Sequence, residues 1–247
     1  MHVRRNPDKS ITVHMTKYIE KLLALYLPNG ISSRLGKRSM PYTSRFEGHI
    51  ATALSLGSTS EPTYPDLVKP FQMRLGSLMY LACSCRPDIA FSVCKLCTCM
   101  ARPTPDLMTE IDHLLEYLRV HKAVGLTYSA LHSTLEGMSD ANWGTHRSTS
   151  GWVIKWQGAA LNWGSKKQGC TALSTCEAEI IALSEASKDM VYVRKLIRGL
   201  DPLAITGASS LGTDNKGARD TSYNPEHHSR MKHVERRHFY VRVPGRH

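Results

Sequence analysis

The sequence predicts an α/β fold in which a mixed sheet flanked by helices follows a small helical segment. Between residues 67 and 124, apolar side chains recur at helical spacing in three stretches. From residue 125 the pattern changes to that of short strands, which are followed by a long helix, one more strand and further helices. That order of elements is typical of a sheet covered by helices.

The first half of the chain divides where its composition changes. Residues 1–29 contain a predicted strand at 11–13 and an amphipathic helix over 16–26. Residues 30–66 are rich in Ser, Gly, Pro and basic side chains and have little periodicity, which predicts a linker. The segment 67–124 is the helical one, with predicted helices over 71–85, over 89–100 and from Pro103 and Pro105 onward.

The second half, residues 125–247, carries the predicted sheet. Its longest helix covers 175–200, with Ser174 or Thr175 as the N-cap. Ile180, Leu183 and Met190 recur at helical spacing, so one face of this helix is expected to pack inward. The other predicted elements are strands over 126–129, 135–143, 150–156, 160–163 and 209–213, a short helix from Asn215 and a last helix over 231–242.

The chain is basic, with 247 residues, a formal net charge of +11 and a pI near 9.4. This charge indicates a polyanionic partner, usually nucleic acid, and the alternative is a merely soluble basic surface. No apolar run approaches the ~20 residues of a membrane span, so no membrane partner is expected. Residues 1–9 lack the apolar stretch of a signal peptide.

Cysteines are unevenly distributed, since five of the seven lie within residues 83–99. Cys94 and Cys97 form a CxxC pair, but no second pair or nearby His completes a tetrahedral zinc site. The stretch also has helical periodicity, so buried apolar cysteines are favoured over a zinc module. Free thiols predict a reducing intracellular compartment, cytoplasm or nucleus.

Three acidic residues lie where a metal site can be assembled. Asp140 falls in a predicted strand, Asp214 at the end of another, and Glu179 near the start of the long helix. Hard divalent cations prefer such carboxylate oxygens. The alternatives are a solvated strand residue for Asp140 and a helix cap for Asp214. Glu177 competes with Glu179, from which it lies two residues away on a different helix face.

Several motifs occur together in one order along the chain. They include Ser139-Asp140-Ala141 and Thr213-Asp214-Asn215, and the full set covers residues 138–143, 148–153, 162–168, 172–179, 213–215 and 228–235. In these runs the sequence resembles the ribonuclease H domain of copia-type (Ty1/copia) retrotransposon Pol polyproteins. Upstream, residues 75–81 and 86–90 resemble the connection segment between polymerase and nuclease, and residues 18–23 resemble the tail of the reverse transcriptase.

The resemblance implies a ribonuclease H-like fold and a two-metal nuclease that uses Mg²⁺, or Mn²⁺ in its place. The small residues that follow Glu179 at helical spacing match the family and favour Glu179 over Glu177, which would then be a first-turn residue stabilised by the helix dipole. His233 is a candidate proton shuttle or product-release group, with a structural role as its alternative. The implied catalytic and metal-binding residues are Asp140, Glu179, Asp214 and Glu235.

The implied activity is hydrolysis of the RNA strand of an RNA–DNA hybrid, which leaves 5′-phosphate and 3′-hydroxyl ends. The polymerase is not expected in this chain, because the adjacent aspartates of its catalytic element are missing from the sequence. An upstream reverse transcriptase is the expected neighbour in the parent polyprotein. The alternative is an inactive retroelement remnant that binds nucleic acid through its charge. The candidate phosphate contacts are Ser148, Thr149, Ser150, Lys166 and Lys167.

Overall fold

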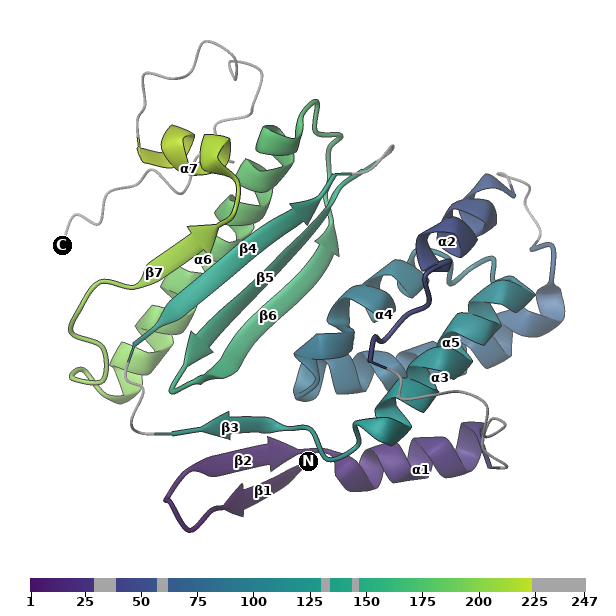
Figure 1. Cartoon of the computed structure of the whole chain (residues 1–247), viewed down its shortest axis with the longest axis horizontal. Coiled ribbons are helices and arrows are strands. Elements are labelled where there is room, and N and C mark those ends of the chain that lie inside the picture. Colours follow the sequence, from purple (N-terminus) through teal and green to yellow (C-terminus); the bar gives the residue numbers. More distant parts are fainter. Residues whose placement is uncertain (29–38, 57–61, 130–133, 144–146, 224–247) are drawn as a thin grey trace. The chain divides into compact units, whose positions relative to one another are not determined.

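The computed structural model describes residues 1–28, 39–56, 62–129, 134–143 and 147–223 (Figure 1). The chain forms two compact units. The first comprises residues 1–7 and 11–126, and the second comprises residues 8–10 and 127–247. The division after residue 126 falls next to the start that the sequence predicts for the nuclease-like region.

The first unit consists of a hairpin and a group of helices. In the hairpin, β1 and β2 pair antiparallel, with Val3 opposite Val13. The described elements are β1 (His2–Arg5), β2 (Ile11–His14), α1 (Thr16–Tyr26), α2 (Phe46–Ser55), α3 (Pro65–Ser84), η1 (Pro87–Ile89), α4 (Ala90–Cys97) and α5 (Pro105–Val120).

These helices share one apolar core. On α3 the buried side chains recur every three or four residues, which places Phe71, Leu75 and Leu78 on a single helix face. The apolar stripe of α5, which includes Leu107 and Ile111, is buried in the same cluster. The tail region 1–29 and the helical segment 67–124 therefore contribute to one core, although the sequence pattern had suggested separate segments.

The linker prediction for residues 30–66 is wrong in its central part, which forms α2. Phe46, Ile50 and Ala53 lie at helical spacing on this short helix, and all three are buried in the core of the first unit. Because Ser, Gly and Pro residues flank this helix on both sides, its apolar periodicity is weak in any wide sequence window. Part of the predicted linker is thus a structural helix.

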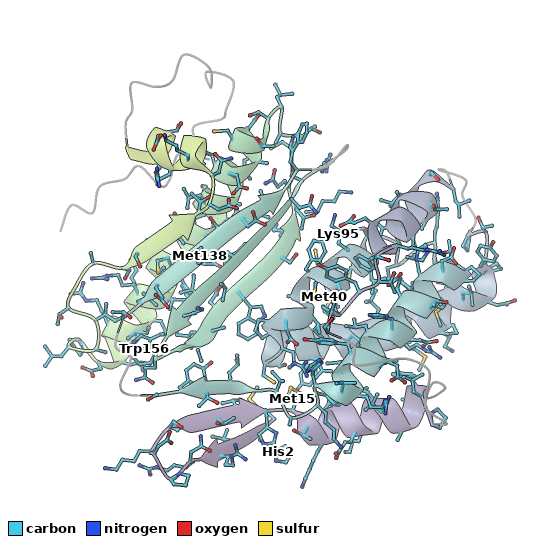
Figure 2. All side chains as sticks on the ribbon, viewed as in Figure 1. His2, Met15, Met40, Lys95, Met138 and Trp156 are labelled. Carbon is cyan, nitrogen blue, oxygen red and sulfur yellow. The ribbon has the colours of Figure 1, made fainter. Side chains whose placement is uncertain are left out.

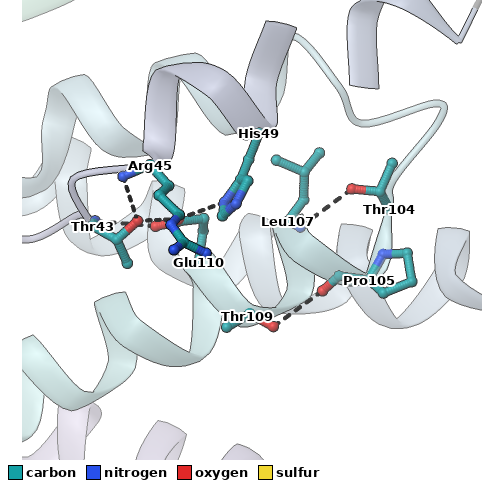
Figure 3. Close-up of polar contacts among 8 residues, drawn as sticks. All are labelled: Thr43, Arg45, His49, Thr104, Pro105, Leu107, Thr109 and Glu110. Carbon is teal, nitrogen blue, oxygen red and sulfur yellow. Dashed lines mark hydrogen bonds and ion pairs between the residues drawn. The ribbon is translucent and has the colours of Figure 1, made fainter. Parts of the chain in front are cut away.

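Glu110 joins the segment before α2 to α5 (Figure 3). Its carboxylate is 1% exposed and accepts hydrogen bonds from the backbone N–H and the hydroxyl of Thr43. His49 Nδ1 lies 2.8 Å from the same carboxylate. Nearby, Thr104 caps α5 by accepting the backbone N–H of Leu107 at 3.3 Å. These contacts satisfy a buried charge and fix the start of α2 against α5.

The second unit contains a four-stranded mixed sheet in the order β6-β5-β4-β7. Neighbouring strands are antiparallel in the pairs β4–β5 and β5–β6 and parallel in the pair β4–β7. The boundary between the two units falls within β3 (Leu126–Tyr128), after its first residue. The other elements of the second unit are β4 (Glu136–Asn142), β5 (Thr149–Trp156), β6 (Ala159–Lys167), α6 (Thr175–Leu200), β7 (Ser210–Thr213) and α7 (Lys216–Tyr223).

Helix α6 runs along one face of this sheet (Figure 1). Side chains alternate between the faces of a strand, so Gly137 and Ala141 of β4 face the helix while Met138 is 54% exposed (Figure 2). Ile154 of β5 packs with Met190 of α6 in the core between the two layers. The helix thereby fixes the position of its own side chains over β4.

The predicted α/β class is confirmed by this mixed arrangement of helices and sheets, and the predicted helix over 175–200 coincides with α6. Strand β6 continues to Lys167, beyond the predicted end at 163, because residues 164–167 pair with β5. The prediction ended early because Gly164-Ser165-Lys166-Lys167 lacks an apolar pattern. The sequence pattern also missed β1. The predicted helix over 231–242 lies outside the described residues.

None of the described helices combines the length and apolarity needed to cross a lipid bilayer.

Candidate metal centre

Three carboxylates from three different elements converge in the second unit. Asp140 lies on β4, Glu179 on α6, and Asp214 directly after β7. One oxygen atom of each carboxylate lies within 4.8 Å of the others. Within the described part of the chain, no other group of three or more His, Cys, Asp or Glu side chains comes together in this way.

The parallel pairing of β4 with β7 explains why the two aspartates meet. Ser139 and Thr213 are direct partners in this pair, so Asp140 and Asp214 each follow a paired residue at the same end of the sheet. Neighbouring strands lie about 4.8 Å apart. Two residues that are 74 positions apart in the sequence (214 minus 140) therefore become neighbours.

Glu179 reaches both of these strands from the helix. It is only 5% exposed. Its Oε1 accepts the backbone N–H of Ala141 at 3.2 Å, and its Oε2 accepts the hydroxyl of Thr213 at 3.3 Å. These two hydrogen bonds hold the carboxylate between Asp140 and Asp214.

The centre has an excess of negative charge. The pKa of Glu179 is raised to about 7, mainly because the carboxylate is buried and also because it faces the carboxylates of Asp140 and Asp214. The hydrogen bonds from Ala141 and Thr213 act in the opposite direction, because they favour the ionised carboxylate. Three like charges so close together favour either a proton on Glu179 or a bound cation.

Glu177 has a different position. Its Oε2 accepts the backbone N–H of Leu173 at 2.7 Å, and its own backbone N–H donates to Ser174 Oγ at 3.1 Å. The side chain thus caps the first turn of α6, in the manner of a capping box. Of the two glutamates that the sequence offered, the structure brings Glu179, and not Glu177, to Asp140 and Asp214.

The remaining predicted residues differ in their positions. Glu235 and His233 lie outside the described residues. Ser148, Thr149 and Ser150 are buried, whereas Lys166 and Lys167 are exposed. The lysines alone among these five candidates are therefore freely accessible to a phosphate.

Two further residues lie near the centre. Thr213 positions Glu179, and the only available signal was its place directly before Asp214 at the end of a predicted strand. Trp143 is 53% exposed three residues after Asp140, and its indole N–H donates to the carbonyl oxygen of Ala172 at 3.3 Å. By contrast, the Trp152 indole packs in the core and donates to Asp189 at 2.8 Å.

The cysteines do not form a metal centre among the described residues. Cys85 and Cys99 are buried in or beside the helical core, and all seven cysteines are free thiols. Burial, together with a smaller effect of the neighbouring Cys94 and Cys83, raises the pKa of Cys97 to about 11. Such thiols stay protonated at neutral pH, whereas zinc binds thiolates.

Comparison with known proteins identifies relatives across nearly the whole chain. The Pol polyprotein of transposon TNT 1-94 from Nicotiana tabacum is 28% identical over 97% of this chain, and that of transposon RE1 from Arabidopsis thaliana is 31% identical over 71%. Both are described as retrovirus-related. These homologues are Pol polyproteins of copia-type retrotransposons.

This retrotransposon Pol homologue spans only a small part of those relatives, 18% of the tobacco polyprotein and 12% of RE1. A third relative, the secreted RxLR effector protein 161 of Plasmopara viticola, is 37% identical over 50% of the chain, which covers 91% of that protein. No protein-family model matches the chain. No solved structure matches it either.

Proposed function

We propose that this retrotransposon Pol homologue is a ribonuclease H, which hydrolyses the RNA strand of an RNA–DNA hybrid with the help of divalent metal ions. The observation that supports this most is the convergence of Asp140, Glu179 and Asp214 within 4.8 Å. The motif resemblance to the nuclease domain of copia-type elements points to the same three residues. The parent polyprotein would supply the upstream reverse transcriptase.

The donor set fits Mg²⁺ or Mn²⁺. Both are hard cations that prefer carboxylate oxygens, and all three side chains of the centre offer them. The pKa of Glu179 is raised to about 7 because the carboxylate is buried and faces two other carboxylates, a repulsion that a bound cation would relieve. Bound divalent ions would supply an activated water and stabilise charge on the leaving oxygen.

The chain's own residues would bind and orient. Asp140 and Asp214 are exposed on the edge of the centre, so they can be approached from solvent by a phosphodiester. Glu179 is held behind them by the Ala141 N–H and the Thr213 hydroxyl, which keep its oxygens directed at the same point. In this proposal Glu235 is a fourth ligand.

The test is cleavage of a labelled RNA–DNA hybrid by wild type and by Asp140→Asn, in Mg²⁺ and in EDTA. We expect Mg²⁺-dependent products with 5′-phosphate ends from wild type and a rate at least about a hundredfold lower from the variant, because one carboxylate ligand is removed. Asp220→Asn is the matched control, since Asp220 is an exposed carboxylate on α7 outside the centre. Undiminished cleavage by Asp140→Asn contradicts the proposal.

A second function is supported by the net charge of +11. A chain that binds nucleic acid without cutting it would show salt-sensitive binding of the hybrid and no Mg²⁺-dependent product. The same gel, with a parallel binding titration, separates this binding-only function from the nuclease.

A further inference from the structure

The C-terminal half of α6 exposes a row of apolar side chains to solvent. Tyr192, Leu196 and Leu200 recur every four residues along the helix and are 63%, 49% and 82% exposed. Leu203, in the turn that follows the helix, is 80% exposed as well. A contiguous group of large apolar side chains on a surface indicates an interaction site. We call Tyr192, Leu196 and Leu200 the α6 stripe.

This exposure is confined to one half of the helix. Residues 177–184 are all buried, and α7 packs over that half, where Ile180 and Ala218 share one apolar cluster (Figure 1). In the other half, Val193 and Ile197 pack in the core against the sheet, and no described element covers the stripe. Packing within the described part of the unit therefore does not account for the three apolar side chains.

Positive charge borders the stripe on one side. Residues 188–200 contain four basic side chains and one acidic side chain. Lys195 and Arg198 lie one turn apart, and both are exposed. Neither has a hydrogen bond or ion pair in the described part of the chain. The helix dipole favours basic residues near a helix C-terminus, but it does not explain the apolar side chains beside them.

The other charged groups of this half-helix already have partners. Asp189 accepts the indole N–H of Trp152 at 2.8 Å. Lys188 Nζ lies 2.9 Å from Glu185 Oε1, and Arg194 donates to the segment before β7. A partner that approaches the stripe therefore meets apolar side chains and two free cations, and no free carboxylate from residues 188–200.

We propose that the α6 stripe binds an amphipathic helix of another protein, one with an apolar seam and acidic side chains along its edge. An apolar row at four-residue spacing fits the apolar face of a second helix. Carboxylates that border the partner's seam would pair with Lys195 and Arg198, as the residues that flank the seam do in coiled coils. The proposal does not depend on the nuclease function, because Glu179 lies roughly 20 Å from the stripe along α6 at 1.5 Å per residue.

Two other occupants fit this surface less well. In a pair of identical copies, Lys195 and Arg198 of both copies would border one seam, so like charges would face each other. An anionic lipid surface would match the charge, but helices that lie on membranes bury a broad apolar face. The stripe is a single row of side chains.

The experiment uses two synthetic probes. A fluorescein-labelled peptide of about 21 residues carries leucine at the a and d positions of its heptads and glutamate at e and g. In the second peptide, lysine replaces each glutamate. Each peptide is titrated with the full-length protein in EDTA, and binding is followed by anisotropy. We expect wild type to bind the acidic peptide at least about tenfold more tightly than the basic one, because only the acidic peptide can pair with the two cations.

Two variants of the stripe test its apolar and charged parts separately. Lys195→Glu/Arg198→Glu is expected to reverse the preference, so that the basic peptide binds more tightly than the acidic one. Leu196→Ser/Leu200→Ser is expected to weaken binding of the acidic peptide by at least about tenfold, because two leucines no longer leave water on binding.

Each variant has a matched control in the first unit. Lys17→Glu/Lys21→Glu makes the same change of net charge at two exposed lysines one turn apart on α1. Leu25→Ser/Leu54→Ser removes two exposed leucines. We expect each control to change the affinity for the acidic peptide by less than about threefold. Equal losses in stripe and control variants overturn the proposal, and circular dichroism spectra like that of wild type show that the variants are folded.

Sedimentation velocity and vesicle flotation test the other two occupants. A wild-type dimer that Leu196→Ser/Leu200→Ser dissociates would assign the stripe to a second copy. Flotation of wild type with vesicles that contain phosphatidylserine, lost in the same variant, would assign it to lipid. Either result, or a wild type that does not bind the acidic peptide, overturns the proposal. Cleavage of the hybrid is measured separately, so a failure of the nuclease function leaves this test unaffected.

Discussion

At the scale of single residues, Glu179 shows how a candidate centre opposes the stability of its own fold. The carboxylate is buried between two others, and two hydrogen bonds only partly offset the desolvation. Position alone left Glu177 and Glu179 as alternatives, because both lie near the start of the same helix, and the resemblance to the family favoured Glu179. What separates them is contact with β4 and β7, which depends on a strand pairing that no local pattern encodes.

We predict that Glu179→Gln stabilises the metal-free protein and removes its Mg²⁺-dependent cleavage. The pKa of Glu179 is raised in the folded state, so its favourable contribution is complete below pH 4.5 and is lost as the pH rises to about 7. Glutamine has no charge to bury. The gain should be near zero at pH 4.5 and about 2 kcal/mol at pH 8.

Thermal unfolding of both proteins in EDTA at several pH values measures this effect. Glu185→Gln is the control, since Glu185 lies on the same helix outside the centre. A difference between Glu179→Gln and wild type that does not change with pH would contradict the electrostatic explanation.

At the scale of elements, the sheet depends on pairs of side chains that face each other across strands. Trp152 of β5 is the direct partner of Gly164 of β6, and its indole lies where a side chain at residue 164 would be. The indole also donates to Asp189 on α6, so it connects the sheet with the helix. Glycine at residue 164 makes room for this arrangement.

We predict that Gly164→Ala destabilises the second unit by about 1–3 kcal/mol, because the new methyl group collides with the Trp152 ring. Urea unfolding followed by tryptophan fluorescence measures the change. Gly151→Ala is the matched control on the neighbouring strand, where the added Cβ would meet nothing closer than 3.9 Å. If both substitutions have the same effect, the indole is not the cause.

The elements differ in how much of them local sequence reveals. Helix α6 was predicted to the residue because its cap and apolar spacing are both local signals. Helix α2 was missed because it is short and lies between Ser- and Gly-rich flanks, and the end of β6 was missed because its residues form a strand only through pairing with β5. The sequence predicted that the three acidic residues form one metal site, but the pairing of β4 with β7 that brings Asp140 beside Asp214 is not a local signal.

At the scale of the whole molecule, the chain consists of two units with separate cores. The core of the first contains the buried faces of α2, α3 and α5, while that of the second lies between α6 and its sheet. The relationship to retrotransposon Pol polyproteins extends across both units, since the match to the tobacco polyprotein covers 97% of the chain. A change in one core is therefore expected to affect mainly the stability of its own unit.

We predict that Ile50→Ala lowers the stability of the first unit by about 2–4 kcal/mol, because Ile50 is 4% exposed and its removal leaves a cavity. Circular dichroism should show the helix-rich transition at lower urea concentration, while the tryptophan fluorescence transition, which reports on the second unit, stays in place. All four tryptophans lie in residues 143–163.

Leu54→Ala on the same helix is the control, since Leu54 is 45% exposed and its truncation should cost less than about 1 kcal/mol. A fluorescence transition that moves together with the circular dichroism transition in Ile50→Ala would mean that the two units unfold as one.

The parallel pairing of β4 with β7 limits which insertions and deletions the gene can tolerate. Side chains alternate along each strand, so inserting or deleting a single codon within either strand would turn its remaining residues to the opposite face. Asp140 would then point toward α6, or Asp214 would lose its place beside it. Loops of this unit can vary in length, whereas the number of residues in β4 and in β7 has to stay the same.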